Sequence, residues 1–284
     1  MLSTPAPPCV RLMVEGDDPY ENQEMVLRIQ GVICTMQLPP IRKGYPLPEK
    51  GNPRFIKQTV RLTGLGCTTF QQCFSGIARI ASLMGNNIEK GDIETWKPQR
   101  FRDWQALDLE NRFFVRQNDE GDAEGIKIPS DIDPDGILSA LAGDQWVYTD
   151  ENKVCYYRMT MGPDGKERYT SNNPSEFKIG DIVEAQLSTL AVKRRGPGNN
   201  YSFKLVLRAL TLLDASHSKA ARTLRMQEGT QHRPSTGRGI KRTVGYLEAE
   251  DDLDNSVPTA KMTKLTVSDD APLAVGSQSA METS

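Results

Sequence analysis

The chain has 284 residues, a hydrophobic content of 37% and a formal net charge of −2. Average globular domains are roughly 45–50% apolar when glycine is counted, so part of this chain is not expected to pack into a core. Residues 1–10 are rich in proline and lack the apolar stretch of a signal peptide, and the apolar stretches at 77–84 and 205–213 are too short to span a bilayer. We therefore expect a protein of the nucleus or cytoplasm that has no membrane contact.

Charge is distributed unevenly along the chain. Residues 192–244 hold twelve Lys or Arg and two Asp or Glu, whereas residues 245–284 hold two Lys or Arg and eight Asp or Glu. A basic stretch followed by an acidic one is typical of chains that contact polyanions, and equally of a solvated tail. The five cysteines are scattered and odd in number, so we expect reduced thiols and no disulfide framework.

The first part of the chain predicts strands and one helix. Runs of β-branched and apolar residues bounded by proline and glycine predict strands at 10–14, 25–38 and 54–62. The segment 68–84 has apolar residues at helical spacing after a possible capping residue, Thr68, and it is followed by a Gly-Asn-Asn stop. We expect a helix there.

Residues 86–132 follow neither the helical nor the strand period for long. Their aromatic residues, including Trp96, Phe101 and Trp104, are assigned to the core. The acidic, glycine-rich segment 119–125 predicts a loop and marks the best internal boundary.

The pattern is clearest in the second half. Asp133-Pro134 predicts the start of a short helix at 135–141. Alternation of apolar and polar residues, together with a Pro-Asp-Gly hairpin turn, predicts five strands: 145–149, 154–161, 166–170, 182–192 and 201–213. The alternation changes phase after Leu187, which predicts a β-bulge.

These elements predict a mainly β (α+β) fold: a small antiparallel five-stranded β-barrel or meander with a few short helices, plus a disordered C-terminal tail. The expected domains are a β-rich region with one helix at 1–118, the barrel at 126–215, and a third region at 216–284. That third region begins with a basic helix near 218–227 and continues as a disordered acidic tail, which lacks the apolar residues needed to offset its ordering entropy.

Catalytic motifs are not found. The only histidines, His217 and His232, lie in or beside the predicted tail, where a general base would lack a fixed geometry. The alternating aspartates at 131–135 are spaced as in a calcium-binding EF-hand loop, but Ala142 occupies the position that requires glutamate. A reaction that uses carboxylates alone is the remaining enzymatic alternative.

Metal and nucleotide motifs are also incomplete. Cys67 and Cys73 lack the C-x-x-C spacing of a zinc site and are expected to be core residues. The segment Gly64-Leu65-Gly66 lacks the last glycine of a dinucleotide fingerprint and is not followed by a Walker lysine. We therefore expect a protein that is not an enzyme and has no metal or cofactor.

Basic residues cluster around the predicted hairpin of the strands at 182–192 and 201–213. Its loop carries three cations beside a Gly-Pro-Gly turn, and further cations lie in the following strand and helix. If the two strands pair directly, we expect the loop at one rim of the barrel, near the start of the basic helix. The predicted nucleic-acid-binding residues are Lys193, Arg194, Arg195, Lys204, Arg208, Arg222 and Arg225. Tyr156, Tyr157 and Tyr201 would add base stacking where they face outward, although alternation places Tyr201 on the apolar face. The alternative is a charged loop that is only solvated.

The blocks Phe177–Gln186 and Leu205–Asp214, together with Asp150–Val154, resemble a repeated group of uncharacterised proteins in mushroom-forming fungi, which are often found near transposon-like genes. The resemblance covers about residues 130–215. It implies no established function, so no functional residues are transferred. The same blocks are more loosely similar to the five-stranded barrel of oligonucleotide-binding folds, in which a Gly-Asp pair leads into a long strand and a basic hairpin.

Two functional hypotheses follow. The first is a binding module for nucleic acid, single-stranded if the tyrosines stack on bases. The second is a structural or protein-interaction module, in which the edge of the barrel or the acidic tail binds another protein. Salt separates them, because binding through phosphates weakens steeply with ionic strength and an apolar protein interface does not.

Overall fold

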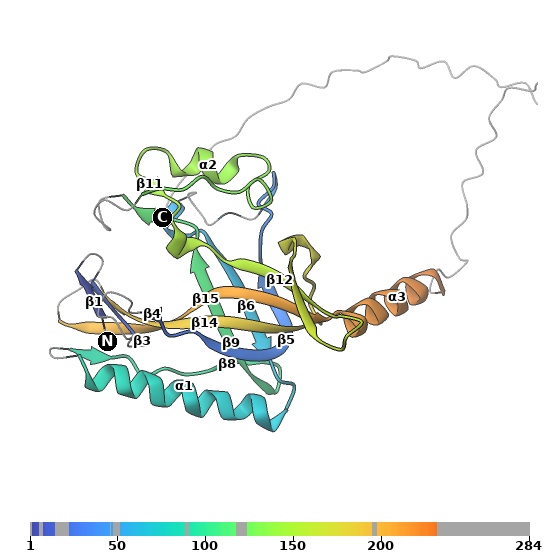
Figure 1. Ribbon diagram of the computed structural model, residues 1–284, viewed down its shortest axis with the longest axis horizontal. Coiled ribbons are helices and arrows are strands. Elements are labelled where there is room, and N and C mark those ends of the chain that lie inside the picture. The colour runs from blue at the N-terminus through green and yellow to red at the C-terminus, as the bar shows by residue number, and fades with distance from the viewer. Residues whose placement is uncertain are drawn as a thin grey trace, which may run out of the picture. The chain divides into compact units, whose positions relative to one another are not determined.

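The computed structural model describes residues 2–5, 8–14, 23–45, 47, 52–88, 91–117, 124–194 and 198–231 (Figure 1). The strands are β1 (Leu2–Pro5), β2 (Pro8–Arg11), β3 (Met13–Val14), β4 (Gln23–Glu24), β5 (Leu27–Gln37), β6 (Lys57–Thr63), β7 (Asp92–Ile93), β8 (Gln99–Phe101), β9 (Trp104–Arg112), β10 (Val115–Arg116), β11 (Trp146–Val147), β12 (Cys155–Met161), β13 (Glu167–Ser171), β14 (Ile182–Lys193) and β15 (Asn200–Asp214). The helices are α1 (Thr68–Asn86), α2 (Ile137–Ala142) and α3 (Ser216–Gln231), with 3-10 turns η2 (Pro53–Phe55), η3 (Asp150–Asn152) and η4 (Pro174–Glu176). No helix in these ranges is long and apolar enough to cross a membrane. The predicted acidic tail lies outside the described residues.

Five long strands pair in a closed series. β5 pairs with β6, β6 with β9, β9 with β15, β15 with β14, and β14 with β5 again. The pairs are antiparallel except for β9 and β15, which run parallel with Val206 opposite Glu110. We call these five strands the ring.

The hairpin of β14 and β15 confirms a specific prediction. The two strands pair directly from Lys193 opposite Tyr201 to Ile182 opposite Asp214. A register shift lies between Gln186 and Leu187, one residue before the predicted bulge, and the residue without a cross-strand partner is Arg208 of β15 and not a residue of β14. Extra residues in one strand of an antiparallel pair increase its local twist.

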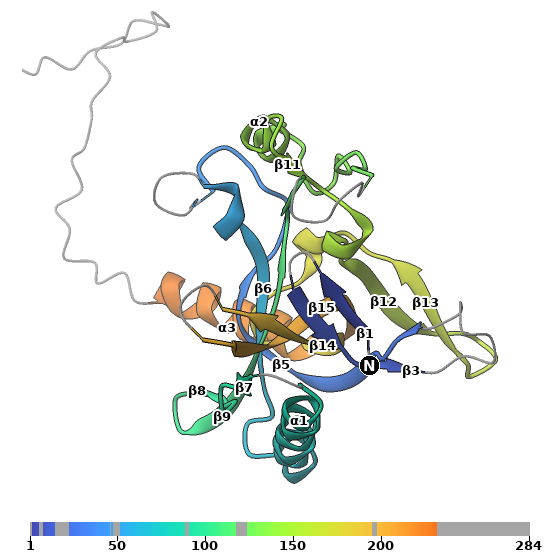
Figure 2. The same cartoon turned by 90° about the vertical axis from the view of Figure 1, so that its left-hand side faces the viewer.

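Alternation along the ring strands produces the main hydrophobic core. Val183, Ala185 and Leu187 on β14 are fully buried. The buried face of α1 packs into the same cluster through residues three or four positions apart, namely Phe70, Phe74, Ile77, Ala81 and Met84. The helix therefore lies along the strands, as both views show (Figures 1 and 2). Since each buried large apolar side chain contributes roughly 1.5–3 kcal/mol, this cluster dominates stability.

Further elements extend the sheet or cover one end of it. β12 pairs in parallel with the end of β15 and carries β13 as an edge strand, while β2 pairs with β14 and carries β1. β10 pairs with β11 in a separate small sheet. This small sheet and α2 contribute to a second hydrophobic cluster that includes Ile41, Phe113 and Leu138.

The mainly β class with a few helices is confirmed, but the strands are combined differently from the prediction. The ring takes three strands from residues 27–112 and two from 182–214. The segment expected as the strand at 145–149 is a two-residue strand that pairs with β10, outside the ring. The sheet therefore runs across the expected boundary at 119–125, and the described elements belong to one compact unit.

Candidate nucleic-acid interface

The turn between β14 and β15 carries the first of the predicted contacts. Lys193, the last residue of β14, is exposed, and Arg194 closes the hairpin by donating its backbone N–H to Asn200 O at 2.8 Å. Tyr201 is partly buried against the main core, as its alternation predicts. Arg195 lies outside the described residues.

An acidic segment flanks this turn. β7 pairs in parallel with the first two residues of β15, and Glu94 forms an exposed ion pair with Arg194 at 3.2 Å. Gly91 makes the close approach possible: it has φ +148°, and a Cβ there would lie 2.1 Å from Asn199 O. The sequence alone does not reveal that Arg194 has a carboxylate neighbour.

Lys204 has its charge balanced on the outer face of the ring. It shares Glu110 with Lys57, at a Lys204–Glu110 separation of 3.2 Å. Burial would raise the pKa of Glu110, but the hydrogen bond from Lys57 and the charge of Lys204 together lower it. Arg61 of β6 also forms a bidentate salt bridge with Asp108 of β9. The outer face of β6 and β9 is thus a mixture of paired charges.

Arg208 makes more ion pairs and hydrogen bonds than any other predicted residue that the structure describes. Its guanidinium lies 2.7 Å from Glu24 and 3.1 Å from Glu151, and it also donates to Ser188 Oγ at 2.9 Å and to the Glu151 carbonyl at 2.8 Å. Arg11 contacts the same two carboxylates at 3.1 and 2.8 Å. We call Arg11, Glu24, Glu151 and Arg208 the arginine network. It joins β2, β4, β15 and η3, and only 15% of the Arg208 side chain is exposed.

The arginine network predicts a pH effect. Burial would raise the pKa of Glu151, but the hydrogen bond and charge of Arg11, with the charge of Arg208, lower it below its ordinary value of 4.5. A carboxylate with a lowered folded-state pKa stabilises the fold above the unfolded value, and that contribution is lost as the pH falls through the folded value. We expect Glu151→Gln to be less stable than wild type at pH 7, and to lose less stability between about pH 5 and pH 3.

Urea unfolding at a series of pH values measures this effect. Glu124→Gln, at an exposed site, is the matched control and should follow the wild-type profile. Parallel stability curves for wild type and Glu151→Gln across the acid range would contradict the assignment.

Arg222 and Arg225 are exposed on α3, and neither makes an ion pair within the part of the chain that the structure describes. The start of α3 is fixed by Asp214, which accepts from the Ser216 backbone N–H at 2.7 Å, and by Ser218, which donates to buried Asp181. The backbone and hydroxyl hydrogen bonds from Ser216 lower the pKa of Asp214. Beyond this anchor the helix extends away from the strands (Figure 1).

The hairpin turn and α3 are not neighbours. The turn precedes β15 and α3 follows it, and β15 has 15 residues, which span up to about 50 Å. The prediction that the basic loop lies near the start of the basic helix is therefore wrong for Lys193 and Arg194. It failed because direct pairing of β14 and β15 fixes the turn at one end of β15 and the helix at the other.

Tyr156 is not available for stacking. It is buried, packs 5.8 Å from the Phe177 ring and donates its hydroxyl to Gln58 Oε1 at 2.6 Å. Gln58 in turn donates to Asn152 O at 3.1 Å, so this tyrosine holds η3 against β6. Tyr157, its neighbour on β12, is partly exposed.

A group of residues that the sequence analysis missed lies at the β8–β9 hairpin. Trp104, expected in the core, is 41% exposed. It pairs across the hairpin with Phe101. Exposed Arg100 and Arg102 lie on β8 and in the turn, and exposed Lys97 precedes β8 by two residues. The sequence does indicate an exposed basic and aromatic group here, because cations alternate with aromatic residues from Lys97 to Trp104. The hydrophobicity of tryptophan nevertheless favoured assigning Trp104 to the core.

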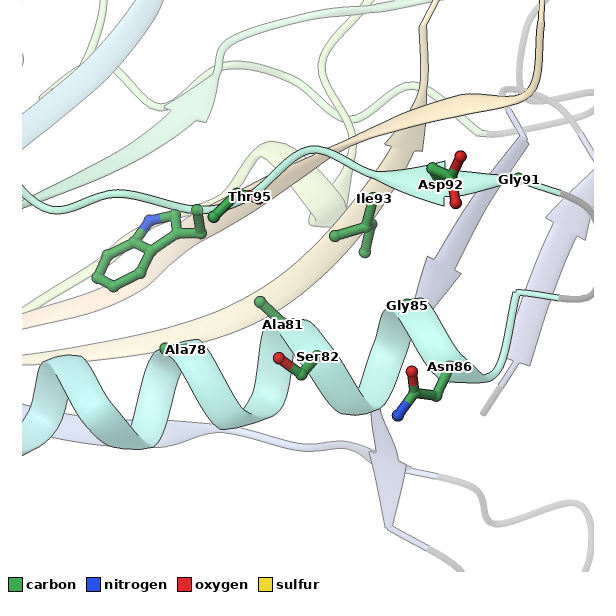
Figure 3. Close-up of a pocket in the computed structure, with 10 residues that line it drawn as sticks. Ala78, Ala81, Ser82, Gly85, Asn86, Gly91, Asp92, Ile93 and Thr95 are labelled. Carbon is green, nitrogen blue, oxygen red and sulfur yellow. The ribbon is translucent and has the colours of Figure 1, made fainter.

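A cavity of about 330 Å³ lies between the second half of α1 and the segment that contains β7 (Figure 3). Ala78, Ala81, Ser82 and Gly85 form its helical wall. Of the described residues that line it, Asp92 alone is charged, so the cavity offers no cation for a phosphate. In the described ranges, no three His, Cys, Asp or Glu side chains gather closely enough to hold a metal ion.

No protein-family model and no curated protein matches the chain. Among solved structures, gp2.5, a single-stranded DNA-binding protein encoded by bacteriophage T7, is similar at 9% identity, over 67% of this chain and 87% of that chain, with a TM-score of 0.33. A TM-score of that size is too low to assign a function to this chain. The resemblance to the fungal protein group stays a prediction.

Proposed function

We propose that the chain is a non-enzymatic protein that binds single-stranded nucleic acid on a small barrel of the oligonucleotide-binding type. The observation that carries this proposal is the closed series of strand pairings. Numbered along the chain, the ring strands follow the order 1-2-3-5-4 and return to 1, with strands 3 and 5 parallel. Five-stranded Greek-key barrels of this kind bind oligonucleotides on the face of strands 2 and 3 and through the connections 1–2 and 4–5.

The connection between strands 4 and 5 is the basic turn. Lys193, Arg194 and Arg195 stand in or beside it, and their cations would neutralise phosphates. Arg222 and Arg225 would form a separate phosphate contact, because α3 begins at the other end of β15. Lys204 and Arg208 are partly buried with their carboxylates, so we assign them to holding the strands in place. The ion pair of Arg194 with Glu94 is exposed on both sides, which leaves Arg194 accessible to a phosphate.

The basic turn gives a direct test. We expect the triple variant Lys193→Ser, Arg194→Ser, Arg195→Ser to keep its fold, because exposed residues bury little and surface changes typically stay within about 0.5 kcal/mol each. Binding to a single-stranded oligonucleotide should weaken by about ten-fold or more at low salt, since each lost phosphate contact removes a counterion-release term. Fluorescence anisotropy with a labelled oligonucleotide at two salt concentrations measures both affinity and salt slope.

A second triple variant removes the same number of charges elsewhere. Lys127→Ser, Lys153→Ser and Lys166→Ser change exposed lysines outside the turn and α3. This control should bind within about two-fold of wild type if contacts, and not net charge, set the affinity. Equal losses in the two triple variants would contradict a specific role for the turn. No binding by wild type at low salt would refute the proposed function.

The alternative is a protein-interaction module, which the exposed edge of the sheet favours. All five residues of β13 are exposed, and on its hairpin Met161 and Tyr169 are exposed large apolar residues. Unpaired strand edges can accept a strand from a partner. Association of that kind would persist at high salt, whereas the proposed nucleic-acid contact would not.

A further inference from the structure

The β8–β9 hairpin is an exposed surface that combines aromatic side chains with positive charge. We define the tryptophan platform as Lys97, Arg100, Phe101, Arg102 and Trp104. It rests on the turn that leads into α1, where Gly66 contacts the indole of Trp104. In Figures 1 and 2 this hairpin is drawn close to α1.

We propose that the tryptophan platform is a base-stacking site for single-stranded nucleic acid, with Trp104 stacking on an unpaired base and Arg100 and Arg102 contacting the adjacent phosphates. This inference rests on the proposed function and adds a contact to it, separate from the β14–β15 turn. No residue of the platform belongs to the set predicted from the sequence.

Trp104 is held in place although it is exposed. A Cβ on Gly66 would lie 2.5 Å from Cζ3 and 2.9 Å from Cη2 of the indole, so the six-membered ring of Trp104 lies directly on the glycine backbone. Phe101 is opposite Trp104 in the β8–β9 ladder, so the backbone of Trp104 is fixed by strand pairing. A pre-positioned aromatic ring loses little conformational entropy when a base stacks on it.

Positive charge at the platform is not balanced as it is elsewhere. Lys97, Arg100 and Arg102 are exposed and form no ion pair in the described part of the chain, and Asp103 is the single acid in the segment 97–104. By contrast, Arg194, Lys204 and Arg208 each have a carboxylate within 3.2 Å. The Arg102 guanidinium is 5.6 Å from the Phe101 ring centroid, in the range of a cation–π contact.

The backbone around the platform is held in an unusual conformation. Of the described residues other than glycine, those with positive φ are Leu65 (48°) and Arg102 (54°). Leu65 precedes Gly66, and Arg102 forms the turn between Phe101 and Trp104. Left-handed backbone at such residues is strained, and strain of this kind is concentrated at ligand-binding sites.

These features select the class of ligand. A flat aromatic surface beside free cations complements a chain that alternates planar bases with phosphates. Stacking on Trp104 requires the face of a base, which is accessible in a single strand and covered in a duplex. We therefore commit to single-stranded nucleic acid as the occupant.

The test compares two probes of equal length: a labelled oligothymidylate and its abasic counterpart, which keeps the phosphates and lacks the bases. We expect Trp104→Ala and Trp104→Leu to weaken oligothymidylate binding by about ten-fold, because one base stack on an aromatic side chain is lost. Trp104→Phe should bind within about three-fold of wild type. Binding of the abasic probe should be the same in all four proteins.

Several controls keep the outcome interpretable. Trp104→Leu retains apolar contact with Gly66, so a loss shared with Trp104→Ala is not a packing effect. Tyr169→Ala removes a similarly exposed aromatic residue from β13 and should bind as wild type does. Thermal unfolding of each variant verifies that the fold is intact.

The remaining results overturn the proposal in distinguishable ways. If wild type binds oligothymidylate and Trp104→Ala binds equally well, the platform is not a contact, while the proposed function stands. An equal loss on the abasic probe would exclude stacking. If wild type binds neither probe but self-associates, and Trp104→Ala abolishes that association, the platform is a protein contact and the proposed function fails with it.

Discussion

Replacing Arg208 with alanine is expected to lower the free energy of unfolding by about 2–3 kcal/mol, a large fraction of the stability of a typical domain. The variant leaves Glu24 and Glu151 with Arg11 as their one remaining cation in the arginine network. It also removes the hydrogen bond that Arg208 donates to the buried Ser188 hydroxyl, whereas the Glu151 carbonyl keeps a second hydrogen bond from Asn111. Breaking a buried ion pair by removing one partner costs about 3–5 kcal/mol. We expect a smaller loss, of about 2–3 kcal/mol, because 45% of the Glu151 side chain is exposed to solvent and water partly compensates for the missing cation.

Chemical denaturation of wild type and variant measures the change. Arg168→Ala is the matched control: its partner Asp164 is 3.5 Å away on the exposed β12–β13 hairpin, and exposed pairs contribute about 0–1 kcal/mol. Arg208→Lys should recover only part of the loss, because an ammonium group cannot reproduce the several directed contacts of a guanidinium. A stable Arg208→Ala that binds an oligonucleotide more weakly would reverse our assignment and make Arg208 a phosphate contact.

Local elements were predictable from the sequence because their signals are local. The helix expected at 68–84 is α1, and the hairpin around Pro163-Asp164-Gly165 joins β12 to β13. The pairing of β14 with β15 also follows from alternation and the short connection between these strands. Each of these depends on residues close together in the chain, where propensity and turn chemistry decide.

The ring itself was not predictable in this way. β9 lies in the segment where neither period held, and its partners β6 and β15 are far away in sequence. Alternation shows that a strand has a buried face, but it does not show which other strand will cover that face. A barrel was therefore expected from residues 126–215 alone, whereas the ring takes its first three strands from the N-terminal region.

The candidate site shows the same limit. The sequence identifies Lys204 and Arg208 as cations on the outer face of a strand, and that is where they lie. It cannot show that Glu110, Glu24 and Glu151 meet them, because those carboxylates arrive from distant elements. The core assignment of Trp104 was wrong because it rested on residue type, and tryptophan is usually buried. Trp104 is exposed because it lies at the start of β9, next to the hairpin turn.

Replacing Gly64 with alanine is expected to destabilise the protein by about 2–3 kcal/mol, through overpacking of the core. A Cβ on Gly64 would lie 2.3 Å from the Phe70 Cβ and 2.5 Å from its Cγ. These atoms are close to the backbone of α1, so no flexible side-chain end can move aside. On its other side, the Phe70 ring would be 2.9 Å from a Cβ on Gly31 of β5. The first turn of α1 and the strands must therefore separate to admit a methyl group.

The same substitution at Gly76 should have the opposite sign, which separates packing from any general effect of replacing glycine. Gly76 is exposed in the middle of α1, and a Cβ there has nothing within 4 Å. Alanine at that position restricts the unfolded chain and favours the helix, so we expect Gly76→Ala to be more stable by about 1 kcal/mol. Thermal and urea unfolding of both variants against wild type measure the two changes. If Gly64→Ala unfolds at the same denaturant concentration as wild type, Phe70 does not insert between β5 and the turn at Gly64. The packing of α1 against the ring would then be looser than its buried face implies.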